Sequence, residues 1–273
     1  MNEMDQSFLK EYSSDFAVQK YSKKTAGLGI NYLLESEYGP IYLKAIREQL
    51  TAPLGKGIRM LEFGCGAGMN LIYCLDLFNR QGIPIEHAYG TDFSERLITE
   101  ARSELRDLPS SLRDPVSFSV ARNETLVTDI ATSLRVAAGE LRGSFHFIFG
   151  VNTFRYPYRL GKGEDCARAI YELLKPGGVC VVIDMNNKFP MFRTRLRDKL
   201  TRPADEHYLP TLKEYAQPFA AAGFEIRENR NFCWVPHSAG RGLLILTRAV
   251  SPLLTSFVPS FAMRSLVVCR RPL

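Results

Sequence analysis

The sequence predicts an α/β fold in which a mainly parallel sheet of seven strands is covered by helices on both faces. Two observations predict it. Short apolar runs alternate with amphipathic helical patterns from about residue 58 to the end of the chain, and strands that alternate with helices form mainly parallel sheets. A glycine-rich turn, residues 64–68, joins the first of these runs directly to the following helix.

Length and composition are those of one large globular domain. The chain has 273 residues, of which 45% are hydrophobic and 23% charged, and this balance excludes disordered, collagen-like and coiled-coil proteins. Residues 1–45 are expected to form an N-terminal helical lid, and residues 46–273 the main domain. The net charge of +6 fits an acidic partner without showing that there is one.

The elements are justified by hydrophobic periodicity in chain order. Seven short, mostly apolar runs are predicted to be strands: Ile58–Phe63, His87–Thr91, Val116–Val120, Phe145–Val151, Val179–Asp184, Phe224–Trp234 and Leu266–Arg270. Five segments between them are predicted to be helices: Met69–Phe78, Glu95–Leu108, Thr125–Ala138, Glu164–Leu174 and Leu212–Ala222.

Capping and breaking residues support these bounds. Ser94 is a suitable N-cap for the second helix, because its hydroxyl can accept from a free amide of the first turn. Pro176-Gly177-Gly178 stops the fourth helix and leads directly into the fifth strand. Gly223 ends the last predicted helix, and Pro218 within that helix predicts a kink.

Two segments interrupt the alternation and are predicted to be cap insertions. They span about residues 188–210 and 236–262, and both leave the sheet near strand ends, where insertions in open α/β folds build ligand pockets. The second is almost entirely apolar. This insertion has three possible roles: part of the core, an apolar wall for a hydrophobic acceptor, or the face that joins two copies in a homodimer.

Several classes of protein and site are not expected. The six cysteines include no C-x-x-C pair, so we expect reduced core thiols, with no zinc or other metal site. The N-terminus lacks the apolar region of a signal peptide, and residues 242–261 are broken by Arg248, Pro252 and Pro259. We therefore expect no membrane span and a cytoplasmic location.

The turn Gly64-Cys65-Gly66-Ala67-Gly68 is suited to bind a ligand. Glycines two residues apart let the backbone approach a ligand closely and adopt positive φ angles, and the following helix directs its free N–H groups at the same place. A dinucleotide-binding G-x-G-x-x-G turn would have its third glycine at Met69 rather than at Gly68. The spacing therefore favours a ligand without a pyrophosphate.

An acidic residue follows at the end of the second predicted strand. Asp92 comes 26 residues after Gly66, where a carboxylate can accept hydrogen bonds from both hydroxyls of a ribose. Phe93 can cover one face of an adenine ring. An ordinary tight turn with a carboxylate at the start of a helix is the simpler alternative, but the joint spacing favours a nucleoside site.

Three motifs together resemble the class I S-adenosylmethionine-dependent methyltransferase family. They are Glu62-x-Gly64-x-Gly66-x-Gly68, Asp92 at the end of the second strand, and Leu174-Lys175-Pro176-Gly177-Gly178 before the fifth. The resemblance covers about residues 56–185. It implies a Rossmann-like sheet that ends in an antiparallel hairpin, and S-adenosylmethionine as the cofactor.

The resemblance also implies roles for individual residues. Gly64, Gly66 and Gly68 would lie against the methionine part of the cofactor, and Glu62 would position its amino group. Asp92 would hold the ribose and Phe93 would pack on the adenine. Gly150, at the end of the fourth strand, would lie beside the cofactor, and Tyr21 of the lid would lie near its carboxylate.

The adenine contact departs from the family pattern. Many members have an aspartate after the third strand that accepts from the adenine amino group, and Arg122 occupies that position here. Arginine cannot accept a hydrogen bond. The side chain of Asn123, or a backbone carbonyl, is expected to accept instead.

The acceptor is expected beside the end of the fourth strand. Asn152 is a candidate to line the methyl channel, and Arg155 and Tyr156 are candidates to anchor a polar substrate, although capping of the strand explains them equally well. Asn-Pro-Pro-Tyr, the signature of some amino-group methyltransferases, is absent. We expect that no nucleic acid is stably bound.

Basic and histidine residues add further candidates. Arginines in the first insertion, with Arg193 foremost, could join Arg155 in binding a carboxylate or phosphate of the acceptor, although a solvated basic helix is the alternative. His207 and His237 lie in the insertions and are general-base candidates without a local motif. His146 is expected to be structural.

The sequence therefore predicts a methyltransferase that acts on a small-molecule, biosynthetic acceptor, either anionic or partly hydrophobic, by in-line displacement. The alternatives are an RNA or protein methyltransferase, which the basic charge favours, and a non-catalytic module that binds S-adenosylmethionine. The acceptor atom, any general base and the oligomeric state are not determined at this stage.

Overall fold

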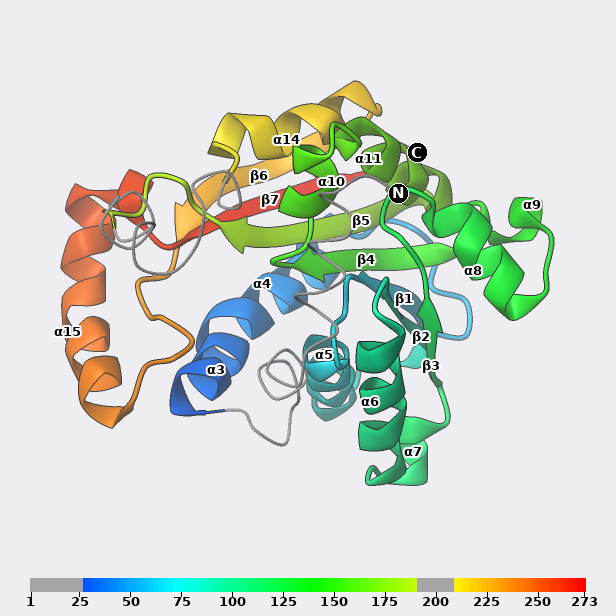
Figure 1. Cartoon of the computed structure of the whole chain (residues 1–273), viewed down its shortest axis with the longest axis horizontal. Coiled ribbons are helices and arrows are strands. Elements are labelled where there is room, and N and C mark those ends of the chain that lie inside the picture. The colour runs from blue at the N-terminus through cyan, green and yellow to red at the C-terminus, as the bar shows by residue number, and fades with distance from the viewer. Residues whose placement is uncertain (1–26, 191–208) are drawn as a thin grey trace.

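A single seven-stranded sheet organises the chain in the computed structural model, which describes residues 27–190 and 209–273 (Figure 1). The strand order is β3-β2-β1-β4-β5-β7-β6. The strands are β1 Ile58–Phe63, β2 Ile85–Asp92, β3 Val116–Val120, β4 Phe145–Val151, β5 Leu174–Met185, β6 Glu225–Phe232 and β7 Arg264–Arg270. The predicted fold class, with its seven strands and terminal hairpin, is confirmed.

The direction of β7 determines which residues meet at one edge of the sheet. The strands β1 to β5 are parallel to one another, whereas β7 is antiparallel to both β5 and β6. The first residue of β7, Arg264, is therefore paired with Met185, which is the last residue of β5. The start of β7 thus lies beside the carboxyl ends of the parallel strands, where ligands bind in open α/β sheets.

Helices cover both faces of the sheet. They are α5 Met69–Arg80, α6 Glu95–Arg106, α7 Ser110–Arg113, α8 Leu126–Leu134, α9 Ala138–Leu141, α10 Arg155–Arg159, α11 Gly163–Leu173, α14 Leu212–Ala221 and α15 Arg241–Phe257. One apolar cluster joins α5 and α6 to one face, and a second joins α8, α11 and α14 to the other. The amphipathic patterns read from the sequence produce these two cores.

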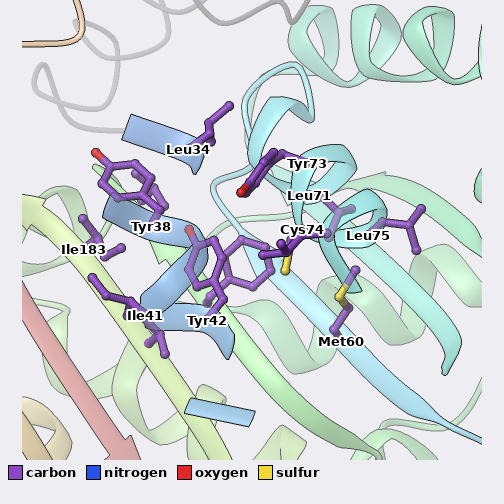
Figure 2. Close-up of a cluster of buried hydrophobic side chains, with 14 of the residues drawn as sticks. Leu34, Tyr38, Ile41, Tyr42, Met60, Leu71, Tyr73, Cys74, Leu75 and Ile183 are labelled. Atoms are coloured by element: carbon purple, nitrogen blue, oxygen red, sulfur yellow. The ribbon is translucent and has the colours of Figure 1, made fainter. Parts of the chain in front are cut away.

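A helical segment before β1 packs against the same face as α5. It consists of α3 Leu28–Tyr32, α4 Gly39–Lys44 and the π-helical stretches Leu33–Tyr38 and Ala45–Gln49. Tyr42 is fully buried, and its ring lies 5.1 Å from that of Phe149 and 6.0 Å from that of Phe147, centroid to centroid. Figure 2 shows this segment against α5 and β1. The described part of the expected lid is thus part of the core.

Two predicted boundaries differ from the structure because of local backbone geometry. The third predicted helix, 125–138, ends at Leu134, since Arg135 adopts a left-handed conformation with φ 56°. Pro176-Gly177-Gly178 ends α11 as predicted but already lies within β5. The pairing with β4 shifts there, from Phe145 opposite Leu174 to Phe147 opposite Val179. Gly177, with φ 75°, provides this irregularity.

Most of the second insertion forms α15, whose apolar side chains lie outside the core except for Leu244, which packs partly buried against it. None of its residues is buried, and the exposed ones include Ile245, Leu253 and Phe257. The core interpretation is therefore wrong for this helix, because an apolar composition does not say whether another element covers it. Among the residues described, no helix is both long and apolar enough to span a bilayer. The six cysteines are buried free thiols.

Candidate functional site

A pocket opens at the edge of the sheet where the parallel strands end. Residues at or just after the carboxyl ends of β1, β2, β3 and β4 line it, together with the first residue of β7: Gly64, Asp92, Arg122, Asn152 and Arg264. Side chains of the N-terminal helical segment form its wall opposite the glycine turn, namely Ile30, Leu33, Leu34 and Tyr38. Its volume, including the open mouth, is about 1220 Å³.

The three glycines of the turn have different functions. Gly64, Gly66 and Gly68 have φ angles of 63°, 56° and 82°. Residues other than glycine rarely adopt φ angles in this range. Gly64 and Gly66 line the pocket, but Gly68 does not. A Cβ at Gly68 would lie 2.6 Å from the ring of Phe118. Gly68 therefore lets the start of α5 pack against β3, while the first two glycines provide the floor of the pocket.

Asp92 connects the glycine turn to the end of β2. Its carboxylate accepts from the backbone N–H of Gly66 at 3.0 Å and from that of Ser94 at 2.9 Å. Burial raises the pKa of Asp92 to about 6, although both hydrogen bonds act in the opposite direction. Each oxygen keeps a free lone pair, so the carboxylate can accept further hydrogen bonds from a ligand in the pocket.

Glu62 carries a buried carboxyl group beside the start of α5. It is completely buried, and neither side-chain oxygen has a hydrogen-bonding partner in the part of the chain that the structure describes. The Asn70 side chain and the Leu71 amide lie close enough to lower its pKa in part, but their geometry falls short of a hydrogen bond. Burial dominates and raises the pKa well above the usual range.

The residues after β3 hold one another in place and offer one acceptor. The backbone N–H of Arg122 donates to Asp129 at 2.9 Å, and its guanidinium pairs with Glu124 at 2.9 Å. The amide nitrogen of Asn123 donates to the hydroxyl of Thr153 at 2.8 Å. This leaves the side-chain oxygen of Asn123, a pocket residue, as one candidate acceptor, beside the backbone carbonyls that the sequence analysis also considered.

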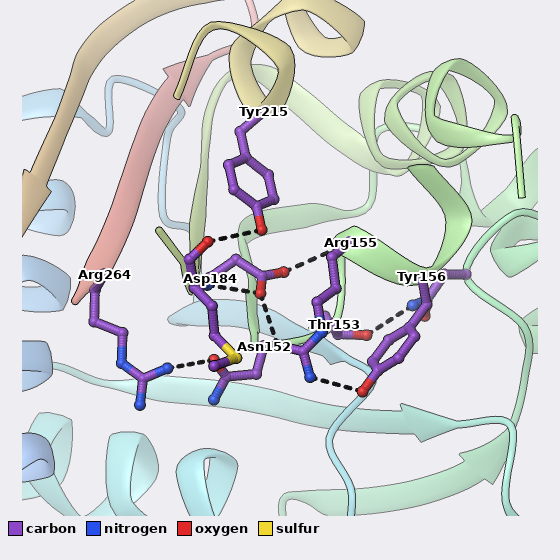
Figure 3. Close-up of polar contacts among 9 residues, drawn as sticks. Asn152, Thr153, Arg155, Tyr156, Asp184, Tyr215 and Arg264 are labelled. Atoms are coloured by element: carbon purple, nitrogen blue, oxygen red, sulfur yellow. Dashed lines mark hydrogen bonds and ion pairs between the residues drawn. The ribbon is translucent and has the colours of Figure 1, made fainter. Parts of the chain in front are cut away.

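Phe93 and Tyr156 both line the pocket. They pack, partly buried, on the fully buried pair Ala67 and Leu97. Figure 3 shows Tyr156 beside Arg155, whose guanidinium donates to the tyrosine hydroxyl at 2.7 Å. An aromatic wall thus extends from the end of β2 to α10. Such a wall is suited to a planar ring.

Arg155 is engaged with a carboxylate inside the protein. Its guanidinium lies 3.2 Å from one oxygen of the buried Asp184, and its backbone N–H donates to the other at 3.0 Å (Figure 3). It does not line the pocket, whereas its neighbours Asn152 and Tyr156 do. The guanidinium that was predicted to contact the substrate is therefore already paired with Asp184. This ion pair holds the loop after β4 against β5.

The remaining sequence candidates are scattered. Gly150 packs against the ring of Phe63, 2.5 Å from where its Cβ would be, and does not line the pocket. Tyr21, Arg193 and His207 lie outside the described residues. His237 lines the pocket. His146 is fully buried, with one ring nitrogen accepting from the Arg59 amide and the other near Pro53 O and Lys175, so it is structural.

Sequence reasoning missed Arg264. It precedes the apolar run of the last strand and belongs to no local motif, so nothing distinguishes it from an ordinary flanking residue. Only the antiparallel direction of β7 brings it to the pocket. Groups of His, Cys, Asp and Glu suited to hold a metal ion are absent from the part of the chain that is described.

Comparisons with known proteins agree with this geometry. A family model described as a methyltransferase domain matches residues 36–229. The citrinin polyketide synthase of Monascus ruber is 29% identical over 146 residues, which are 52% of this chain and 5% of that protein. The chain therefore spans about a twentieth of the length of this curated relative.

Two solved structures share the fold. The citrinin polyketide synthase CMeT domain has a TM-score of 0.58 at 17% identity, covering 94% of this chain and 56% of that one. A SAM-dependent methyltransferase from Aquifex aeolicus has a TM-score of 0.55 at 16% identity, covering 93% and 98%. At these identities the likeness shows the architecture.

Proposed function

Because the chain belongs to the methyltransferase domain family, we propose that it transfers a methyl group from S-adenosylmethionine to a small-molecule acceptor. One observation carries the proposal: the Gly66 amide and the Asp92 carboxylate, which the resemblance assigns to one cofactor, are hydrogen-bonded to each other at 3.0 Å and line the same pocket. A glycine turn and a ribose-binding acid in direct contact are what a nucleoside ligand requires.

The residues of the pocket fit this cofactor. Asp92 would accept from the ribose hydroxyls, Phe93 would cover the adenine, and the free oxygen of Asn123 would accept from the adenine amino group. The unpartnered carboxyl group of Glu62 suits the amino group of the methionine part. When bound, the cofactor supplies an electrophilic methyl carbon on a sulfonium. The protein aligns the acceptor with that carbon and keeps water away from it.

The rest of the pocket supports a small acceptor with apolar surface. Beyond the nucleoside residues it is lined mainly by apolar side chains, which include Leu33 and Leu34 of the N-terminal helical segment, Val151 at the end of β4 and Leu160 after α10. Apolar walls with few polar groups are typical of sites for small molecules. The similarity to a polyketide synthase also favours a biosynthetic acceptor.

Calorimetry and a transfer assay test the proposal. The full chain is titrated with S-adenosylhomocysteine, and then incubated with S-[methyl-³H]adenosylmethionine and a panel of phenolic, carboxylic and 1,3-dicarbonyl acceptors. We expect saturable binding of the nucleoside and transfer of label to at least one member. Failure of the folded protein to bind S-adenosylhomocysteine would refute the proposed function.

We expect the affinity for the nucleoside part to fall at acid pH. The ribose hydroxyls donate to the Asp92 carboxylate, and protonation near pH 6 removes both its charge and an acceptor. The Kd should stay constant above about pH 7 and rise by up to roughly tenfold per pH unit below 6. Titrations with 5′-methylthioadenosine between pH 5 and 8 measure this, because that ligand lacks the amino acid part that Glu62 would contact.

Protonation of Asp92 does not weaken nucleoside binding by unfolding the protein. The pKa of Asp92 in the folded protein lies above its unfolded value of 3.8, so protonation of this group favours the folded state. Its contribution to stability is present at low pH and is lost as the pH rises through about 6. A Kd that stays unchanged down to pH 5 would contradict the assignment of Asp92 to the ribose.

Replacing Glu62 by Gln should weaken S-adenosylhomocysteine binding by roughly tenfold, because the amino group of the ligand loses a carboxylate partner. Binding of 5′-methylthioadenosine, which has no amino group there, should change by less than about twofold. Calorimetry with both ligands measures the difference. Equal losses for the two ligands would show that Glu62 supports the turn as a whole instead of contacting the amino group.

A further inference from the structure

Arg264 is a buried cation that forms no ion pair with a carboxylate among the residues that the structure describes. The residue is 4% exposed and lines the pocket. Its Nη1 donates to the side-chain oxygen of Asn152 at 2.7 Å, and its Nε has no hydrogen-bonding partner. Throughout residues 27–190 and 209–273, no carboxylate forms an ion pair with it.

The nearby buried ion pair shows how unusual this arrangement is. Asp184 is 1% exposed and is paired with Arg155 through two contacts. Burial of a charge without a partner is strongly unfavourable, so Arg264 reduces the stability of the free protein. Groups that are retained at such a cost, and that face a pocket, are candidates for ligand contacts.

Together with Asn152, the Arg264 guanidinium forms a site that offers only hydrogen-bond donors. Its backbone is in the left-handed region at φ 56°, and its N–H is held by the carbonyl of Ile183 at 2.7 Å. A guanidinium has no acceptor, so the side-chain oxygen of Asn152 must face Arg264 and its NH₂ group must face away (Figure 3). Both side chains therefore offer N–H donors to the pocket, and Arg264 adds a positive charge, which suits an anionic oxygen.

The strand order separates Arg264 from Asp92, the residue proposed to bind the ribose. From β2, which ends at Asp92, to β7, which begins at Arg264, the order is β2-β1-β4-β5-β7. Four strand spacings correspond to about 19 Å. Asn152 follows β4, between the two. The donor site therefore lies at the opposite end of the pocket from the nucleoside residues, on the side where the acceptor is expected.

The N-terminal helical segment contributes apolar side chains to the pocket that Arg264 lines. Tyr38 is nearly fully buried and lies within electrostatic range of the guanidinium. It lines the pocket together with Leu33, Leu34 and Ile30 from the same helical segment. A ligand there would place an apolar body against these side chains and a charged group against Arg264.

We propose that Arg264, oriented by Asn152, binds the carboxylate of an acceptor whose body is apolar. The proposal rests on the proposed function and narrows its substrate class to small organic acids. In this proposal Arg264 has the role that the sequence suggested for Arg155. Arg155 itself forms an ion pair with Asp184. A carboxylate can come from the acceptor or from the amino acid part of the cofactor, and the experiment separates the two sources.

The experiment compares wild type, Arg264→Gln, Arg264→Lys and the control Arg113→Gln, which removes an exposed arginine paired with Asp114. Each protein is titrated with S-adenosylhomocysteine and with 5′-methylthioadenosine. After saturation with S-adenosylhomocysteine it is titrated with benzoate, 2,4-dihydroxybenzoate and 4-phenylbutyrate, and with the matching neutral amides. The Tm of each free protein is also measured.

We expect at least one of these acids to bind the saturated wild type at least roughly tenfold more tightly than its amide. Arg264→Gln should reduce acid binding to the level of the amide, Arg264→Lys should restore part of it, and the control should match wild type. Binding of S-adenosylhomocysteine should change by less than about twofold. The Tm of Arg264→Gln should equal or exceed that of wild type, because a buried unpaired charge is removed.

Three results would overturn the proposal. One is the absence of any preference for acid over amide in the wild type, and another is a preference that survives in Arg264→Gln. The third is a loss of S-adenosylhomocysteine affinity in Arg264→Gln without a loss for 5′-methylthioadenosine, which would assign the arginine to the cofactor's own carboxylate. Failure of wild type to bind S-adenosylhomocysteine at all is a separate result and refutes the proposed function.

Discussion

Replacement of Asp92 by Asn is expected to weaken the binding of S-adenosylhomocysteine by roughly 100-fold, since two hydrogen bonds from ribose hydroxyls lose a charged acceptor. Because the ribose is common to both ligands, 5′-methylthioadenosine should lose affinity to a similar extent. This distinguishes Asp92→Asn from Glu62→Gln, whose effect we expect only for the ligand that carries an amino group. Calorimetry at pH 7.5 with both ligands measures the two losses.

The folded state should change little in this variant, because two effects oppose each other. Removal of a buried charge is stabilising, as the raised pKa of Asp92 indicates. However, the NH₂ group of Asn cannot accept, so one of the two hydrogen bonds from Gly66 and Ser94 is lost. The exposed Asp114→Asn is the matched control. If Asp92→Asn kept wild-type affinity while folded, the nucleoside would have to bind elsewhere.

Replacement of Gly64 by Ala is expected to have the largest effect on stability. Its φ of 63° costs an L-residue about 1 kcal/mol, and its new Cβ would lie 1.9 Å from the hydroxyl of Thr153. The loop after β4 would have to move away from β1, which disrupts Asn123 and Asn152 together. We expect a loss of at least about 3 kcal/mol in the free energy of unfolding and no detectable nucleoside binding.

Gly82→Ala is the control that separates the steric clash with Thr153 from the backbone strain at a positive φ. Gly82 has a similar φ of 66°, but a Cβ there meets nothing within 4 Å. This variant should lose only about 1 kcal/mol and should bind S-adenosylhomocysteine normally. Urea denaturation of both variants measures the difference. Equal losses would mean that the close approach between Gly64 and Thr153 does not exist in solution.

The contact between the glycine turn and Asp92, which we propose binds the nucleoside, was predictable because its residues are determined locally. Gly64 and Gly66 follow one strand, and Asp92 ends the next. Adjacent parallel strands bring their carboxyl ends together, so two spacings along the chain imply one contact in space. Asn123 was one of two candidates for the adenine contact, with a backbone carbonyl as the other, because Arg122 cannot accept a hydrogen bond.

The acceptor half was predictable in position but not in detail. The loop after β4 does line the pocket through Asn152 and Tyr156. The sequence also favoured Arg155, because an arginine at that place carries the right charge, and it could not show that Asp184 at the end of β5 neutralises it. A charge has a function only relative to its partners, and partners distant along the chain are not visible in a local pattern.

The sequence by itself determined the order of strands and helices, the glycine turn and the acid that it meets, because each depends on residues close together in the chain. Tertiary structure alone decided that α15 is exposed, that Arg155 is neutralised, and that Arg264 reaches Asn152, which lies 112 residues earlier in the chain. The physical reason is that burial and charge pairing depend on which distant elements pack together. Here the reversed direction of β7 places an otherwise unremarkable arginine beside Asn152.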